Sequence, residues 1–183
     1  YGVAMSPVTE FTSEGLPEFL VKDIPPEPLA GGPIVESPQI YYGEATDDWV
    51  IVNSRTQEFD HPTNDEPVYR PYGDGPGVKI SGFLRRLLFA WRFTDVNIFI
   101  TGEVNSDSKI LYFRNIQDRV RHLAPFLELD QDPYIVTVDG KLLWIQDAYT
   151  TSDRFPYSEP TPLGFNYIRN SVKVVIDAYD GSI

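Results

Sequence analysis

The side chains best suited to chemistry or recognition gather in one stretch of this chain, residues 144–160, where rings, acids and a base alternate. Aromatic rings supply flat apolar area for stacking, and carboxylates supply hydrogen-bond acceptors and, when protonated, donors. Such a mixture suits recognition of a sugar or a partner, or hydrolysis by paired carboxylates. The candidate ligand or partner surface consists of Trp144, Asp147, Tyr149, Asp153, Arg154, Tyr157 and Glu159.

The same stretch begins as a strand and then predicts a long, ordered loop. Aromatic residues bring large apolar areas, and Pro156, Pro160 and Pro162 restrict the backbone. A long loop inside a compact domain is uncommon unless it is functional or packed by its own side chains. We therefore expect it to pack as a lid over the end of a sheet, with its charges paired locally. A ligand-binding or partner-binding loop is the alternative.

No catalytic residue is assigned. His61 lies in a loop and His122 near a helix end, and neither has a partner visible in the sequence. A Ser-His-Asp site depends on geometry, and the chain lacks the glycine pattern of a nucleophile elbow.

No metal or cofactor is assigned either. Calcium needs six to eight oxygen ligands, and acids in 130–132 together with Asp147, Asp153 and Glu159 offer some of them. No EF-hand spacing is present. Solvated aspartates in turns are therefore the favoured interpretation, and calcium binding is the alternative.

The amino-acid composition limits the kinds of partner that this chain is expected to bind. The 183 residues are 42% hydrophobic and 14% aromatic, which is enough for a core, and the formal charge is −12. That charge argues against nucleic acid and against adhesion to an anionic bilayer. The most apolar region, Phe83 to Ile100, is interrupted by three arginines and an aspartate, so no direct membrane insertion is expected. The absence of cysteine excludes disulfides and thiolate chemistry.

Two parts are predicted along the chain, an extended Pro-rich arm (1–38) and an α+β domain (39–183). Seven prolines prevent a long helix in the arm. Its expected anchors are Leu16, Phe19, Leu20 and Ile24.

The domain predicts a mostly antiparallel sheet with two helices on one face. One hairpin joins 40–42 to 49–52. Another joins 134–138 to 141–145 through Asp139-Gly140, a favoured two-residue turn. A strand over 172–179 ends at Asp180-Gly181, a second hairpin turn that the end of the chain truncates.

Ser81 is expected to cap a helix over 81–93, with a short helical run at 96–100. Ser106 or Asp107 is expected to cap a second helix over 108–124. Val68 to Arg70 is the one extended patch expected in the loop 61–77.

Three motifs carry a resemblance to a known family. They are Tyr41-Tyr42-Gly43-Glu44, the run W-I-Q-D-A-Y-T-T-S-D-R-F-P-Y-S from Trp144 to Ser158, and N-Y-I-R-N-S-V-K from Asn166 to Lys173. Together they resemble an uncharacterised family of large bacterial membrane proteins, over nearly the whole chain from about Gly15. The resemblance implies several membrane-spanning helices in the first part of the protein and a long extracytoplasmic region containing this segment. It implies no activity and no catalytic residue.

Taken together, the sequence predicts a non-enzymatic extracytoplasmic piece of a bacterial integral membrane protein that serves assembly, envelope interaction or transport. The expected partner is the remainder of the same protein, with self-association as an option. We expect both chain ends to be cuts in a longer polypeptide. The alternative function is a glycan-binding or carboxylate-based hydrolytic module built on the 144–160 loop.

Overall fold

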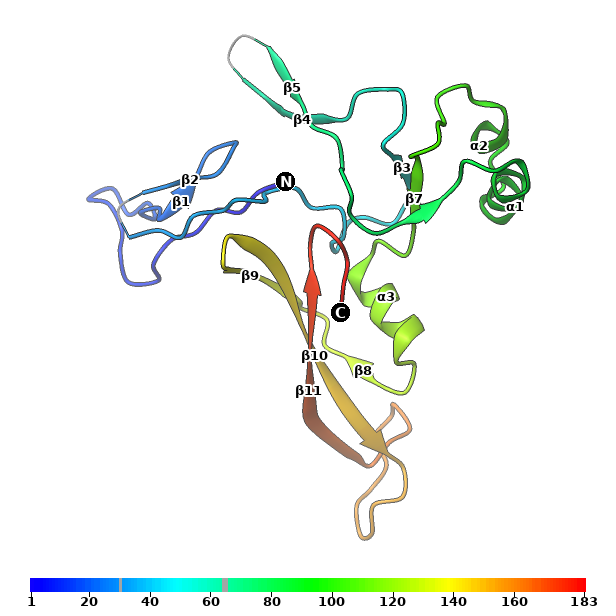
Figure 1. Ribbon diagram of the computed structural model, residues 1–183. Helices are drawn as coiled ribbons and strands as arrows, with labels where there is room; N and C mark the ends of the chain where they lie inside the picture. Colours follow the sequence, from blue (N-terminus) through cyan, green and yellow to red (C-terminus); the bar gives the residue numbers. More distant parts are fainter. Residues whose placement is uncertain (30, 64–65) are drawn as a thin grey trace. The chain divides into compact units, whose positions relative to one another are not determined.

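The computed structural model describes residues 1–29, 31–63 and 66–183 and divides the chain into two compact units (Figure 1). Unit 1 comprises Tyr1–Asp47 and Arg114–Ile183, and unit 2 comprises Asp48–Phe113. Both combine antiparallel strands with helix, which confirms the α+β class. None of the helices in the described ranges is long and apolar enough to cross a bilayer.

Unit 1 is built on a four-stranded antiparallel sheet dominated by one long hairpin. Its strands are β8 (Glu128–Leu129), β9 (Tyr134–Val138), β10 (Lys141–Ser152) and β11 (Tyr167–Asp177). β10 pairs along its length with β11, while β8 and β9 pair with different parts of the other edge of β10. The long hairpin therefore carries most of the residues singled out in the sequence.

The predicted Asp-Gly hairpin turn is confirmed. Asp139 and Gly140 have φ values of 49° and 77°, so both adopt the left-handed conformation that a two-residue primed turn requires. A side chain on Gly140 would also meet the Glu36 side chain at 2.8 Å. This turn sets the register of β9 against β10.

The N-terminal segment folds onto the same sheet. A small hairpin of β1 (Val21–Lys22) and β2 (Glu27–Pro28) forms, and Met5 bridges to Val21. Glu36 donates its backbone N–H to the carbonyl of Gly140 at 2.8 Å. The segment thus pairs largely with itself and joins the sheet at Glu36 and Ser37.

The anchors predicted for this segment are mostly wrong. Leu16, Phe19 and Ile24 are exposed, whereas Val21 is fully buried. A cluster of Val21, Val35, Leu142 and Ala178 forms the core there. Strand pairing turned Val21 inward, because alternate residues of a strand face opposite sides.

The second predicted helix is much shorter than expected. Lys109–Leu111 is a strand, β7, and helix α3 covers only Ile116–Leu123, with Asn115 as its cap in place of Ser106 or Asp107. Phe113 has a φ of 50°, a left-handed conformation that interrupts helical geometry.

Unit 2 holds a three-stranded sheet, a separate hairpin and two helices. The sheet runs β3 (Val50–Val52), β7, β6 (Val78–Lys79), and the hairpin joins β4 (Phe59–Pro62) to β5 (Pro67–Tyr69). β5 corresponds to the predicted extended patch in the 61–77 loop. Its pairing with β4 was not predicted.

The hairpin predicted between 40–42 and 49–52 is wrong. β3 pairs with β7 instead, and residues 40–42 lie outside any strand. Tyr41 and Tyr42 both donate their backbone N–H groups to the carbonyl of Ala178 at 2.9 Å. Contacts with the end of β11 therefore replaced the local pairing.

Helices α1 (Phe83–Phe93) and α2 (Asn97–Ile100) confirm both helical predictions in this region, although Gly82 rather than Ser81 is the cap. Their buried residues pack with Ile80 and Ile110 of unit 2. α1 belongs to unit 2 and α3 to unit 1, so the two main helices lie in different compact units.

Candidate functional site

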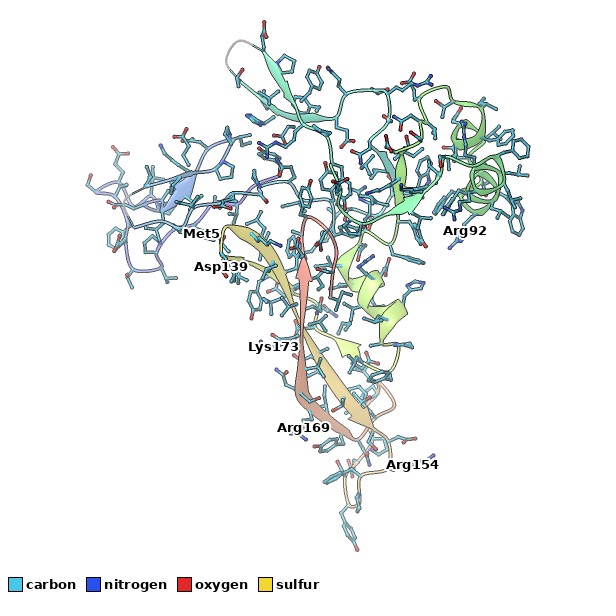
Figure 2. All side chains as sticks on the ribbon, in the orientation of Figure 1. Met5, Arg92, Asp139, Arg154, Arg169 and Lys173 are labelled. Atoms are coloured by element: carbon cyan, nitrogen blue, oxygen red, sulfur yellow. The ribbon has the colours of Figure 1, made fainter. Side chains whose placement is uncertain are left out.

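The long hairpin distributes the predicted surface along its length rather than gathering it. Figure 2 shows Asp139, Lys173 and Arg154 in that order from the turn at one end of the hairpin to the loop at the other. Trp144 precedes Ser152 by eight positions on β10, or roughly 26 Å at the usual rise per residue. Trp144 and Tyr157 therefore do not form one stacking surface.

Trp144 has a structural role. Its indole Nε1 donates to the carbonyl oxygen of Tyr42 at 2.9 Å, and its half-buried ring packs on the core cluster of unit 1. Gly43 comes close to the same ring, since an added side chain there would meet it at 3.6 Å. Trp144 thus fixes the Tyr41–Glu44 motif onto β10.

Asp147 and Tyr149 lie two residues apart on β10 and take part in one polar network. Asp147 Oδ1 accepts a hydrogen bond from Lys173 Nζ at 2.6 Å, and the two residues are direct cross-strand partners. Tyr149 Oη donates to Asp130 Oδ2, also at 2.6 Å. The Lys173 ammonium additionally lies 5.7 Å from the ring centre of Tyr134. We call these five residues the β10 polar network.

These contacts move three pKa values away from neutrality. The hydrogen bond from the Tyr149 hydroxyl, aided by the backbone N–H of Asp132, lowers the pKa of Asp130. The same bond raises the pKa of Tyr149, and the Asp147 carboxylate raises the pKa of Lys173. At neutral pH the network therefore holds a carboxylate, a neutral phenol and an ammonium. General acid–base catalysis favours the opposite, a pKa near the working pH.

Gln146 supports the network from the buried side of β10. Its Nε2 donates to the carbonyl oxygens of Asp130 at 2.8 Å and Asp147 at 3.0 Å, while its buried Oε1 has no hydrogen-bond partner among the described residues. The predicted surface did not include this residue, because the prediction was built on rings and charged groups and Gln146 is neither. Alternation along β10 was the available signal, since Gln146 lies on the same side as Leu142 and Ala148, which are also buried.

The loop after β10 is shorter than predicted, and its own hydrogen bonds hold it. Asn166 Oδ1 accepts from the backbone N–H of Phe155 at 3.0 Å. Asn166 Nδ2 donates to the carbonyls of Phe155 and Ser158. The Phe155 ring stacks on that of Tyr167, with centres 4.8 Å apart and planes 14° apart. We call residues 153–166 the tip loop.

The tip loop does not pack as a lid, which corrects the prediction. Tyr157 is fully exposed with a φ of 62°. Asp153 and Arg154 pair at 3.7 Å, as expected, but both remain largely exposed, and Glu159 is exposed as well. The loop therefore presents ring surface and charge to its surroundings.

The histidines have partners that the sequence did not reveal. His61 Nδ1 lies 3.0 Å from Oδ2 of its neighbour Asp60, whose buried side chain also approaches Arg70 at 3.9 Å. His122 Nδ1 lies 2.8 Å from the carbonyl oxygen of Asp118, one helical turn back. Both arrangements fit local structural roles.

The acids do not converge as metal ligands. Within residues 1–29, 31–63 and 66–183, no three His, Asp or Glu side chains come together to hold an ion. The Asp130 carboxylate instead accepts from Tyr149 and from the backbone of Asp132. The calcium alternative thus gains no support from this part of the chain.

Comparison with known proteins agrees with the motifs. A family model described as "Uncharacterised protein family (UPF0182)" matches residues 1–183. The chain belongs to the UPF0182 family. UPF0182 proteins of Pelotomaculum thermopropionicum, Sulfurovum sp. and Cupriavidus necator are 56%, 54% and 54% identical to it over 187, 189 and 183 residues. Each match covers 100% of this chain but 20% of the relative. The chain thus spans one fifth of the length of these UPF0182 relatives, and no solved structure matches it.

Proposed function

We propose that this UPF0182 segment is a non-catalytic module of a bacterial integral membrane protein, placed on the extracytoplasmic side and used for assembly, envelope interaction or transport. One observation carries the non-catalytic part. The ionisable side chains of the candidate site bond to one another, as Asp130 to Tyr149 and Asp147 to Lys173. What remains available is the exposed tip loop, a surface suited to contact.

The directions of the pKa shifts support this interpretation. Asp130 is pushed further below neutrality, and Tyr149 and Lys173 further above it. Asp153 and Glu159 lie exposed on the tip loop. They therefore lack the apolar enclosure in which a catalytic carboxyl acid typically lies.

Engineered cysteines in a full-length UPF0182 protein test the location. This segment has no cysteine, so Tyr157→Cys adds a single exposed thiol to it. Labelling of intact cells by a membrane-impermeant maleimide, above the background of the parent protein, supports the extracytoplasmic side. Labelling only after lysis contradicts it. Ala148→Cys, at a fully buried position, is the matched control and should react only after denaturation.

A second function, glycan binding at the tip loop, is favoured by one observation. The stacked Phe155–Tyr167 pair and the exposed Tyr157 offer ring surface of the kind that sugars stack on. Calorimetric titration with cellohexaose and chitohexaose tests it. Binding heat that is lost in the Tyr157→Ala and Phe155→Ala variants would support glycan binding. If neither sugar gives any binding heat with the unchanged chain, this alternative is removed.

A further inference from the structure

Helix α1 has an exposed apolar face in addition to the face that it buries. Its leucines, Leu84, Leu87 and Leu88, are exposed, and Trp91 is 82% exposed. The exposed apolar side chains of this region are Phe83, Leu84, Leu87, Leu88, Trp91, Val96 and Ile100. We call them the α1 outer face.

The opposite side of α1 is already occupied. Ala90 is buried, and Phe89 and Phe93 pack with it in the core of unit 2. Phe93 also stacks on Trp49 at 5.6 Å. A helix whose apolar residues extend well beyond a single stripe is normally covered on more than one side. α1 therefore has the composition of a helix with neighbours on both faces, of which unit 2 supplies one.

The outer face is hollowed where α1 meets α2. A groove of about 430 Å³ opens there, lined by Leu87, Ala90, Trp91, Thr94, Val96 and Phe99. A volume in this range is typical of grooves that receive apolar groups of a ligand or of a docked helix. The shape thus suits inserted side chains better than a flat contact.

Charge on α1 is of one sign. Arg85, Arg86 and Arg92 lie on the helix, and no acid lies in its sequence. Arg86 is engaged locally, since its Nε donates to the carbonyl of Ile98 at 3.2 Å. Arg85 and Arg92 are exposed, although Arg85 Nη1 donates to the carbonyl of Lys79 at 3.3 Å and the Arg92 guanidinium lies 5.5 Å from the ring centre of Phe93. A partner of the outer face is therefore expected to carry acids beside its apolar side chains.

We propose that the α1 outer face docks an amphipathic segment of the same polypeptide, one lying in the four fifths of the protein that this chain does not span. This inference rests on the proposal that the chain is a module of a longer protein. A segment on the same polypeptide is tethered, and its effective concentration reaches the millimolar range for short linkers. Exposed apolar patches of this kind usually mark an interaction site.

Two other occupants fit less well. A second copy meeting the face by two-fold symmetry would bring Arg85 and Arg92 toward identical arginines, since such an interface uses the same patch twice. An anionic bilayer would repel a chain of net charge −12. An acidic, apolar segment of the same protein satisfies both the groove and the arginines.

Photo-crosslinking in a full-length UPF0182 protein tests the occupant. Benzoylphenylalanine replaces Trp91 or, separately, Leu88, and mass spectrometry maps the products after irradiation. We expect a link within one polypeptide to a peptide outside the 183-residue segment. A product of twice the mass, a lipid adduct or no adduct at either position would overturn the proposal. The same group at Phe126, exposed in unit 1, controls for links made by any exposed position.

Stability provides a second readout. Leu87→Glu and Trp91→Glu should leave the melting temperature of the 183-residue chain unchanged, because both side chains are exposed in it. In the full-length protein the same changes should lower it by about 2 °C or more. Leu123→Glu, at an exposed leucine of α3, should be neutral in both. Equal effects in the two proteins would contradict docking. The cysteine labelling above reads the location alone, so either proposal can fail separately.

Discussion

At the scale of single residues, the bond between Tyr149 and Asp130 links charge state to stability. The folded pKa of Asp130 lies below its ordinary value of 3.8. Its contribution is therefore complete above that value and is lost as pH falls through the folded pKa. The folded pKa of Tyr149 lies above 10.0, so its contribution is present below that value and is lost as pH rises through the folded pKa. The pair thus stabilises the fold across the neutral range.

Removing the Tyr149 hydroxyl should return the pKa of Asp130 toward its ordinary value. In Tyr149→Phe the largest cause of the low pKa is absent, so the pKa of Asp130 should rise toward 3.8. NMR titration of the carboxyl carbon measures this, and the acid loss of stability should become less steep than in the unchanged chain. Tyr167→Phe, whose ring stacks on Phe155, should leave the Asp130 value unchanged. An unaltered pKa in Tyr149→Phe would show that the bond does not form in solution.

Sequence alone could single out Asp147 and Tyr149 but not their partners. Lys173 lies opposite Asp147 only because β10 and β11 pair in one register, with an irregularity between Ala148 and Tyr149. A strand predicted to start at residue 172 does not define that register, because a shift of one residue would turn every side chain to the other face. Asp130 comes from a different strand connection altogether. Partners on neighbouring strands are therefore set by the tertiary structure and not by the local sequence.

At the scale of elements, α3 depends on its cap. The helix has only eight residues, and the Asn115 side chain accepts from the backbone N–H groups of Gln117 and Asp118. Asn115→Ala should therefore reduce the free energy of unfolding by about 1 kcal/mol, measured by urea denaturation. Asn115→Ser keeps a capping oxygen and should lose less. Equal losses for both variants would assign the effect to the amide's bonds with Glu44 and Asp47 instead.

The tip loop depends on Asn166 in a similar way. Its side-chain amide accepts one hydrogen bond from the Phe155 backbone and donates two, to the carbonyls of Phe155 and Ser158. Asn166→Ala should speed amide hydrogen exchange in 153–166 by about tenfold or more, since each lost bond contributes up to about 1.5 kcal/mol. Exchange in β9 should not change. Glu159→Ala, on the same loop, is the control, and comparable exchange in both variants would contradict this role.

Local signals predicted elements well where no distant strand competed. Asp139-Gly140 fixed its own turn, and the periodicity of 83–93 located α1. The helix over 108–124 failed because Ile110 and Leu111 are needed in β7 against β3, a pairing across about sixty residues. The aromatic residues of the loop predicted a lid, but the Phe155 ring stacks on Tyr167 and remains half exposed. These errors reflect tertiary contacts overriding local preference.

At the scale of the whole molecule, the polypeptide leaves unit 1 after residue 47 and returns to it at residue 114. Backbone hydrogen bonds join these two points, which we call the neck. The backbone N–H of Gly43 donates to the carbonyl of Arg114, and that of Ile116 donates to the carbonyl of Gly43, both at 3.1 Å. Thr46 Oγ1 donates to the same Arg114 carbonyl at 2.8 Å. Residues of unit 1 thus hold together the points where the chain leaves for unit 2 and returns from it, and the pairing of β3 with β7 continues this contact inside unit 2.

This neck predicts that unit 1 folds without unit 2. Exit and return points that lie close together are typical of positions that tolerate inserted domains. Replacing residues 48–113 by a short Gly-Ser linker should therefore leave a cooperative thermal transition and the lowered pKa of Asp130, read by calorimetry and carboxyl NMR.

The matched deletion removes residues 1–29, which contribute Met5 and fully buried Val21 to the core with Leu142 and Ala178. Deleting residues 1–29 should abolish the transition, because it exposes core side chains of the sheet to water. Replacing residues 48–113, by contrast, only shortens a connection between two points that already lie together. If removing 48–113 also abolished it, unit 2 would be required for the fold of unit 1. The hydrogen bonds at Gly43 would then be a consequence of that fold rather than its closure.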